Sequence, residues 1–379
     1  MKIAYIMYNY QAFSELWLQR QIAMLRENIA FIAAVDAREK KWNNDIPVVN
    51  LGYRSLINRI MTKIGLKNRQ PSNEIYVNNL ISVLDEISVD LIFVNFMSFA
   101  YDLRSIILKA DSKIIIHTHG YDITWDLLDR NTGVAVYDRK YTDFVKKISG
   151  KALIIANSNY SKKSLLDIGV PENKIMTKNF GVPLEPQKPI NNTTKVTVLF
   201  LGRLIECKGP DLVIKAFELA CDKGMNGDLI IAGGGNLEFE CRKLREESRY
   251  KEKIKLVGVV SPEQGEALRQ SADIFTAHNC KSSTTNQVEA FGVSIIEAMA
   301  AGLPVVTGAS GGVTHSIVDG ETGYLFTSGD VERHANLLLK LADNPSLRQE
   351  MGARGRHRVR IEFSMEQEAK CLREALRIS

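Results

Sequence analysis

The segment from Glu289 to Val306 reads EAFGVSIIEAMAAGLPVV. Apolar residues recur at helical spacing within it, which predicts a helix from about Ser294 to Ala301. Gly302 supplies a left-handed cap, and Pro304 blocks continuation of the helix. The turn before the helix, residues 291–293, is expected to leave the first backbone N–H groups bare, with the positive end of the helix dipole behind them. Such a helix end binds anions, and phosphate is the usual ligand.

Two carboxylates flank this helix end. Glu289 lies in the turn ahead of it, and Glu297 lies in its first turns. A carboxylate repels a bound diphosphate unless hydroxyl donors occupy it, and a nucleotide sugar provides such donors as ribose and hexose hydroxyls. The competing interpretation is that both glutamates are solvated charges on a helix.

The spacing of Glu289 and Glu297 resembles the E-x7-E motif of retaining glycosyltransferases, and the surrounding segment is similar to family 4 of these enzymes, which has the GT-B fold. The resemblance implies an α/β fold of two Rossmann-like domains, each a doubly wound parallel sheet, that face a cleft. It also implies transfer of a hexose from a nucleoside diphosphate sugar with retention at the anomeric carbon.

Length and composition agree with a two-domain globular protein. The chain has 379 residues, too many for one core, with 45% hydrophobic and 25% charged residues. It contains no run of 18 apolar residues and no signal-peptide pattern at its N-terminus, so we expect a cytoplasmic protein. Five cysteines without C-x-x-C pairing indicate reduced thiols. The net charge of +5 is mild; it fits an anionic substrate or membrane surface, and does not by itself indicate a nucleic-acid partner.

Short apolar runs of strand length alternate with helical patterns, which predicts parallel sheets covered on both faces. Expected strands span residues 3–7, 31–35, 91–95, 114–117 and 153–156, and then 196–201, 229–232, 254–257, 274–277 and 305–306. The segment between the two series is rich in proline and lacks periodicity, as a linker does. The predicted units are an acceptor-binding domain (1–180), a linker (181–195), a nucleotide-sugar-binding domain (196–364) and a C-terminal helix (365–379) that crosses back to the first domain, as the resemblance implies.

Candidate donor-binding residues follow the strands of the second domain. Arg203 can bind phosphate oxygens bidentately, and Lys208 adds a point charge. Together these two residues could neutralise a leaving diphosphate without a metal. The alternative is a surface arginine and lysine in a turn. Gly233, in a glycine cluster that a tight turn explains equally well, and Val259, placed beside the base by the resemblance, are further candidates. The remaining donor candidates belong to the helix end and its second carboxylate: Phe291, Gly292, Val293, Ser294 and Glu297.

The first domain carries the segment His117-Thr-His119-Gly-Tyr121-Asp122 after an expected strand. Two histidines two residues apart face the same side of a strand, yet no third ligand cluster accompanies them, so we expect no metal here. The resemblance places His119 near the donor sugar and the acceptor, makes Tyr121 and Asp122 acceptor-side residues, and leaves His117 as a packed strand residue. The chain contains no Asp-x-Asp triplet, and a metal-independent reaction without cofactors is expected.

The loop after the first strand contains Ser14 and Glu15. These residues resemble a Ser-Glu-Thr motif in exopolysaccharide glycosyltransferases, although Leu16 replaces the threonine, and the resemblance makes them acceptor-binding. A helix cap formed by Ser14, with Glu15 in the first turn, is the competing explanation.

Residues 53–69 combine one apolar helical stripe with five basic residues and no acid. An amphipathic helix of this kind can lie on an anionic membrane, and this would bring the enzyme to a lipid-linked acceptor. A stripe packed on the sheet with solvated charges explains the pattern equally well.

We therefore expect a hexosyltransferase of cell-surface polysaccharide synthesis. Its donor would be UDP- or GDP-linked and its acceptor a hydroxyl of a glycan or lipid-linked glycan. Glu289 would position the donor sugar, Glu297 the ribose, and Arg203, Lys208 and the helix end would stabilise the leaving group. A nucleotide-sugar epimerase and a non-catalytic partner subunit with the same fold are the alternatives.

Overall fold

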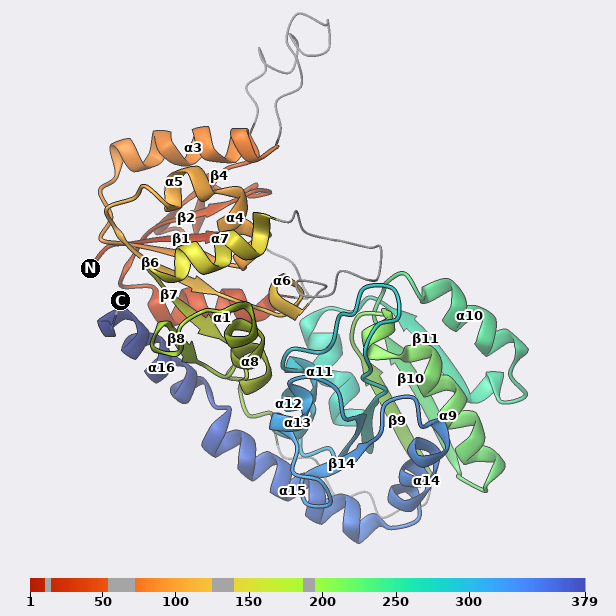
Figure 1. Ribbon diagram of the computed structural model, residues 1–379. Coiled ribbons are helices and arrows are strands. Elements are labelled where there is room, and N and C mark those ends of the chain that lie inside the picture. Colours follow the sequence, from red (N-terminus) through yellow and green to blue (C-terminus); the bar gives the residue numbers. More distant parts are fainter. Residues whose placement is uncertain (11–14, 54–71, 125–139, 187–194, 379) are drawn as a thin grey trace, which may run out of the picture.

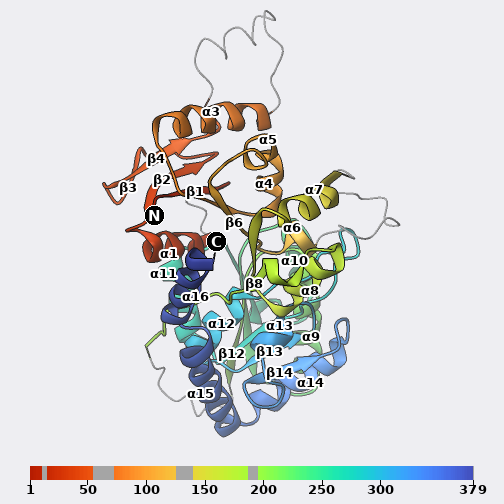
Figure 2. The same ribbon diagram turned by 60° about the vertical axis from the view of Figure 1, so that its left-hand side comes forward.

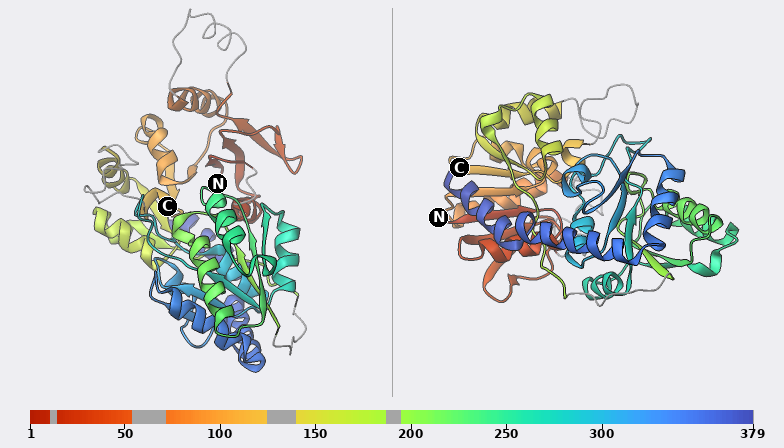
Figure 3. Two further views of the ribbon diagram at one scale, coloured as in Figure 1. Left: turned by 90° about the vertical axis from the view of Figure 1, so that its right-hand side faces the viewer. Right: turned by 90° about the horizontal axis from the view of Figure 1, so that it is seen from below.

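The computed structural model describes residues 1–10, 15–53, 72–124, 140–186 and 195–378 (Figure 1). It contains two units, each a sheet with helices on both faces, which lie side by side in the views of Figures 1 and 3. Almost all strand pairings are parallel, so the predicted two-unit parallel α/β architecture is confirmed.

The first unit has an eight-stranded sheet in the order β3-β4-β2-β1-β5-β6-β7-β8. Its central strands are buried along their whole length, which explains their unbroken runs of apolar residues. The strands are β1 (Ile3–Met7), β2 (Ile29–Ala34), β3 (Lys41–Trp42), β4 (Ile46–Asn50), β5 (Leu91–Asn95), β6 (Lys113–His117), β7 (Ala152–Ala156) and β8 (Ile175–Thr177). The helices are α1 (Leu16–Leu25), α3 (Ser72–Glu86), α4 (Met97–Asp102), α5 (Arg104–Ile107), α6 (Tyr121–Thr124), α7 (Lys140–Ser149) and α8 (Asn159–Ile168), with the 3-10 turn η2 (Glu172–Lys174).

The second unit has a six-stranded parallel sheet in the order β11-β10-β9-β12-β13-β14. Its strands are β9 (Val196–Leu201), β10 (Gly227–Ala232), β11 (Ile254–Gly258), β12 (Ile274–Ala277), β13 (Val305–Gly308) and β14 (Gly323–Phe326). The helices are α9 (Pro210–Asp222), α10 (Glu238–Glu247), α11 (Pro262–Ser271), α12 (Val293–Ala300), α13 (Val313–Ser316), α14 (Val331–Ala342), α15 (Pro345–Glu362) and α16 (Met365–Ile378), with the 3-10 turns η3 (Glu206–Lys208) and η4 (Lys251–Lys253).

The helix predicted from Ser294 to Ala301 is α12, displaced by one residue. Gly302 has the expected left-handed backbone, and the amide of Leu303 returns to the carbonyl of Ala298 to close the helix. Four strands were missed: β3, β4, β8 and β14. All four lie at or next to the edges of their sheets, and β3 and β8 have only two and three residues.

The described part of the linker is held against the C-terminal helices. The amide of Val182 donates to the carbonyl of Phe363 at 2.9 Å, and Val182 bridges Ser364 in parallel fashion. Further along, the carboxylate of Glu185 forms an ion pair with Arg269 of α11. Residues 181–186 of the linker are therefore attached to the second unit and its C-terminal helices.

Helix α16 continues from α15 and lies against α1 of the first unit, a path that the view from below in Figure 3 shows clearly. Figure 2 shows the same helix from another side. Its Glu368 is buried and forms an ion pair with Lys178, and neither side chain is exposed at all. The second carboxylate oxygen of Glu368 accepts the amide of Gly181 at 2.7 Å, and Gln21 of α1 donates to the first at 3.0 Å. This cluster attaches the C-terminal helix to the first unit.

Replacing Glu368 with glutamine should destabilise the first unit strongly, because it leaves Lys178 as a buried ammonium without its counter-ion. The expected loss is about 3–5 kcal/mol in the free energy of unfolding. Urea titration followed by tryptophan fluorescence measures it, since all three tryptophans, at 17, 42 and 125, belong to the first half of the chain. Glu366→Gln, an exposed position on the same helix, is the matched control. Equal midpoints for the two variants would show that the ion pair does not anchor α16.

Candidate active site

The strand order of each sheet reverses near its middle, between β1 and β5 in the first unit and between β9 and β12 in the second. Ligands of open parallel sheets bind beyond the carboxyl ends of the strands at such points. The loops after β1 and β6 carry the candidate residues of the first unit, and the loops after β9 and β12 carry the principal ones of the second. In Figure 1, α1 and α8 of the first unit lie beside α11 and α12 of the second. Ser158, at the start of α8, donates its hydroxyl to the carbonyl of Ala290 at 2.6 Å.

The Glu289 carboxylate forms an ion pair with Lys208, the last residue of η3. The two side chains expose only 15% and 12% of their surface. Burial by itself raises the pKa of Glu289, but the charge and hydrogen bond of Lys208, with a further contribution from Arg203, outweigh burial and leave that pKa below its ordinary value. Glu289 is therefore an ionised carboxylate whose negative charge is balanced within the site.

Glu289 also occupies part of the predicted anion site at the start of α12. Gly292 is the N-cap residue, with φ at 88°, and its amide donates to Oε1 of Glu289 at 3.0 Å. The amide of Phe291 points to the same oxygen at 3.4 Å. Glu289 therefore occupies two amides of the turn that precedes the helix. Within the described ranges, the amides of Val293 and Ser294, the first two of α12, have no hydrogen-bond acceptor, as predicted for the start of this helix.

Glu297 is held by two arginines, one from each unit. Its Oε1 lies 3.1 Å from Nη2 of Arg20 in α1, and its Oε2 lies 3.5 Å from Nη1 of Arg269 in α11. Glu297 is thus not a solvated surface charge, and it links α12 to the first unit. Sequence reasoning missed Arg20 because nothing in a ten-residue helix indicates which of its polar residues meets a carboxylate 277 positions away.

Arg203 lies exposed just beyond β9 and acts electrostatically on carboxyls of both units, Glu289 and Glu15. Burial raises the pKa of Glu15 above its ordinary value, while a hydrogen bond from Asn9 and the charge of Arg203 lower it in part. Glu15 is itself the N-cap residue of α1 and makes no side-chain cap hydrogen bond, so the explanation of Glu15 as a first-turn residue does not describe it. Ser14 lies outside the described residues.

Three of the other donor candidates have distinct surroundings. The Phe291 ring is buried between the rings of Phe180 and Phe363, at centroid distances of 5.3 and 5.8 Å, so only its backbone lies at the helix end. Gly233 has φ at 139°, and a Cβ there would lie 1.9 Å from the carbonyl oxygen of Gly202. Only glycine therefore fits at this position, because any Cβ would clash with the backbone of Gly202. Val259 is 70% exposed beyond β11.

His119 is placed by a chain of hydrogen bonds beyond β6. Asn95 donates its amide to the carbonyl of Ile6, which leaves its oxygen to accept from Nε2 of His119 at 3.2 Å. Nδ1 of His119 therefore carries a lone pair, and this buried atom has no partner among the described residues. Burial, with the charge of Lys178, holds the pKa of His119 well below its ordinary value. His117 is fully buried and contacts Gln21, as expected for a packed strand residue.

Asp122 and Tyr121 differ in what they can reach. The buried carboxylate of Asp122 accepts the amides of Met97, His119 and Gly120 at 2.8, 3.0 and 2.8 Å. It shapes the loop that carries His119, and the expected direct contact with an acceptor does not fit a carboxylate that is occupied in this way. Tyr121 is half-buried.

Within the described ranges, no three His, Cys, Asp or Glu side chains gather as a metal site requires. None of the helices described there combines the length and apolar character of a membrane span. Of the basic amphipathic segment 53–69, only the exposed Tyr53 belongs to the described residues.

Comparison with known proteins indicates the class of enzyme to which the chain is similar. Residues 182–358 match the model of the family described as "Glycosyl transferases group 1". The GDP-mannose-dependent monoacylated alpha-(1-6)-phosphatidylinositol monomannoside mannosyltransferase of Corynebacterium glutamicum is 28% identical over 67% of each chain. The amylovoran biosynthesis glycosyltransferase AmsK of Erwinia amylovora is 27% identical over 59% of this chain and 55% of its own.

Solved structures show the same fold across the whole chain. HepE of Anabaena, crystallised with UDP and glucose, has a TM-score of 0.78 at 18% identity and covers 100% of this chain and 99% of its own. WaaG, a glycosyltransferase involved in lipopolysaccharide biosynthesis, has a TM-score of 0.73 at 16% identity with the same coverage. The chain is a glycosyltransferase with the GT-B fold, and its residues 182–358 match the model of the group 1 family.

Proposed function

We propose that the enzyme transfers a hexose from a nucleoside diphosphate sugar to a hydroxyl of a glycan or lipid-linked glycan, with retention at the anomeric carbon, in the synthesis of cell-surface polysaccharide or glycolipid. The relatives named as mannosyltransferases and as capsular or exopolysaccharide glycosyltransferases support this class of reaction. The relative from Corynebacterium glutamicum is GDP-mannose-dependent by name, whereas HepE was crystallised with UDP, so the tests below use both a GDP-linked and a UDP-linked donor.

The observation that carries the proposal is the Lys208–Glu289 pair beside the free amides of α12. When the bond between the anomeric carbon and the diphosphate breaks, negative charge grows on the leaving oxygen. Arg203, Lys208 and the amides of Val293 and Ser294 are donors grouped at one edge of the second sheet, where they would stabilise that charge. We propose that these donors suffice without a metal or another cofactor.

The two glutamates have different proposed tasks. An ionised Glu289 with a lowered pKa is a weak base, which suits acceptance of hydrogen bonds from donor-sugar hydroxyls better than proton abstraction. Glu297 would accept from the ribose hydroxyls, since a carboxylate has about four lone-pair sites and its two arginine contacts use only part of them.

His119 would act on the acceptor side in its neutral form. Its bond to Asn95 places the lone pair on Nδ1, a buried atom, so a sugar hydroxyl can donate to it only once neighbouring side chains move aside. Tyr121, two residues further on, and Glu15, across from Arg203, complete the proposed acceptor side together with Ser14.

A direct assay tests the proposal. GDP-mannose and UDP-glucose are incubated with octyl mannoside or octyl glucoside, and products are identified by mass spectrometry and their anomeric configuration by NMR. We expect a retained glycoside with one donor, at the same rate after treatment with EDTA. A change in the donor incubated alone would instead indicate an epimerase. Binding of the productive nucleotide should raise stability by about 2.7 kcal/mol at 100 times its dissociation constant.

Lys208→Met and Glu289→Gln should both reduce transfer by about 100-fold to 1000-fold, because each removes a charge at the reacting centre. Isothermal titration should separate their roles: Lys208→Met weakens binding of the nucleoside diphosphate, and Glu289→Gln leaves it within a few-fold. Lys215→Met, at an exposed position on α9, is the control and should change neither quantity. Near-normal turnover in the first two variants would refute the site assignment.

The neutral state of His119 predicts a pH dependence of stability. Its pKa is lowered in the folded protein, so the unfolded chain takes up more protons below the ordinary value of 6.5. The contribution of the neutral histidine to the free energy of unfolding is fully present above pH 6.5. Below that pH it falls by about 1.4 kcal/mol per pH unit for one buried histidine. Urea titrations at about pH 7 and 5.5 should therefore show a smaller acid loss for His119→Asn than for the parent protein. The exposed His357→Asn should match the parent. An unchanged loss in His119→Asn would contradict the neutral assignment.

A further inference from the structure

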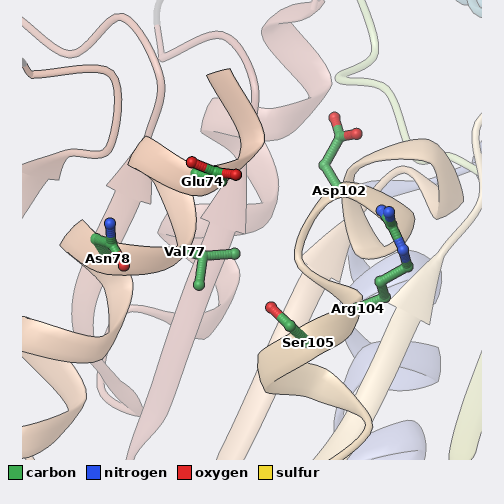
Figure 4. Close-up of a pocket in the computed structure, with 6 residues that line it drawn as sticks. All are labelled: Glu74, Val77, Asn78, Asp102, Arg104 and Ser105. Carbon is green, nitrogen blue, oxygen red and sulfur yellow. The ribbon is translucent and has the colours of Figure 1, made fainter. Parts of the chain in front are cut away.

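A cavity of about 300 Å³ lies in the first unit between α3 and the turn that joins α4 to α5. Figure 4 shows Glu74, Val77 and Asn78 on α3 facing Asp102, Arg104 and Ser105 across it. Its volume is at the lower end of the range for small-molecule pockets, roughly 300–1,000 Å³. That size suits a single ring.

The lining of the cavity is polar and mixed in charge. It offers two carboxylates, one guanidinium, one amide and one hydroxyl, with Val77 as the apolar member. Carboxylates accept from hydroxyl groups, while guanidinium and amide groups donate to them. A phosphate group only accepts hydrogen bonds and is negatively charged, and the Asp102 carboxylate of the lining disfavours it.

Two of the polar side chains are already fixed in place. The hydroxyl of Tyr8 donates to Oδ2 of Asp102 at 2.5 Å. The guanidinium of Arg104 lies over the Tyr101 ring at 4.3 Å, and its Nη1 donates to the carbonyl of Tyr101 at 2.8 Å. Such supports reduce the side-chain entropy lost when a ligand binds.

The cavity adjoins the proposed acceptor side of the site. Tyr8 directly follows β1 and stacks on Phe99 of α4 at 4.0 Å. Its hydroxyl donates to Asp102, and its ring lies 6.2 Å from that of Phe96, which in turn lies 5.4 Å from the ring of Tyr121. Asp102 thus connects the cavity through Tyr8 to Tyr121, two residues beyond His119.

We propose that this cavity binds a neutral, polyhydroxylated ring: a sugar unit of the acceptor glycan at some distance from the hydroxyl that receives the hexose. The assignment rests on the proposed function, because it treats the first unit as the acceptor side. It adds a second contact for the acceptor, remote from the reacting atoms, and such contacts orient a flexible substrate.

Saturation-transfer NMR with mannotriose, maltotriose and cellotriose tests binding directly, with glycerol 3-phosphate and inorganic phosphate as anionic probes. We expect at least one trisaccharide to bind and the anions not to bind in the cavity. Asp102→Asn and Arg104→Gln should each weaken trisaccharide binding about tenfold, the effect of losing one charged hydrogen bond. Glu86→Gln, an exposed position at the other end of α3, should bind as the parent protein does.

The controls separate this proposal from the proposed function. Thermal midpoints of the variants verify that they fold, and nucleotide affinity, which belongs to the second unit, should stay within twofold of the parent. Loss of nucleotide binding or of transfer in the parent protein would count against the proposed function. Failure of all three trisaccharides to bind, binding unaffected by both cavity variants, or preferential binding of the anions would overturn the assignment of the cavity.

Discussion

The carboxylate of Glu289 joins two parts of the site that are distant in sequence, the turn after β9 and the start of α12. One oxygen pairs with Lys208, and the other accepts the amide of Gly292. A largely buried carboxylate without partners would cost several kcal/mol, so both contacts are needed to keep it ionised. The pairing balances the charges of Lys208 and Glu289, and the proposed diphosphate would contact Lys208 together with Arg203 and the amides of Val293 and Ser294. The electrostatic character of the site therefore depends on this single shared carboxylate.

The same helix, α12, also connects the two units. Glu297 pairs with Arg20, the carbonyl of Ala290 accepts the hydroxyl of Ser158, and the Phe291 ring packs on Phe180. Close to this contact, Glu368 of α16 is buried against Lys178, whose ammonium lies 4.7 Å from the centroid of the Phe180 ring. Any motion of one unit against the other must rearrange contacts of α12 and the turn before it, the segment proposed to bind the diphosphate. If that proposal holds, donor binding and the arrangement of the units are coupled through this segment.

Much of the fold could be predicted from local pattern. The bounds of β1, β5, β9 and β12 agree with the expectation residue for residue, because strands buried on both faces appear as continuous apolar runs, and α16 begins at the expected residue. Edge strands such as β3 and β8 were not predicted, because two or three residues are too few to show a periodic pattern. In the site, the type and loop position of Arg203, Lys208, Glu289 and His119 were predicted, whereas Asp122 proved to be a buried support for its loop and Phe291 a core residue.

The sequence by itself determined the succession of strands and helices, the cap at Gly302, and the placement of basic and acidic residues just after strands. These features depend on neighbours within a few positions of the chain. Only the tertiary structure decided which charges meet: Lys208 with Glu289, Arg20 with Glu297, and Lys178 with Glu368, at separations of 81, 277 and 190 positions. The physical reason is that two residues that form an ion pair show no periodic pattern in the sequence. Its partners are selected by how the two sheets and the C-terminal helix pack, and burial then determines how strongly each pair is held.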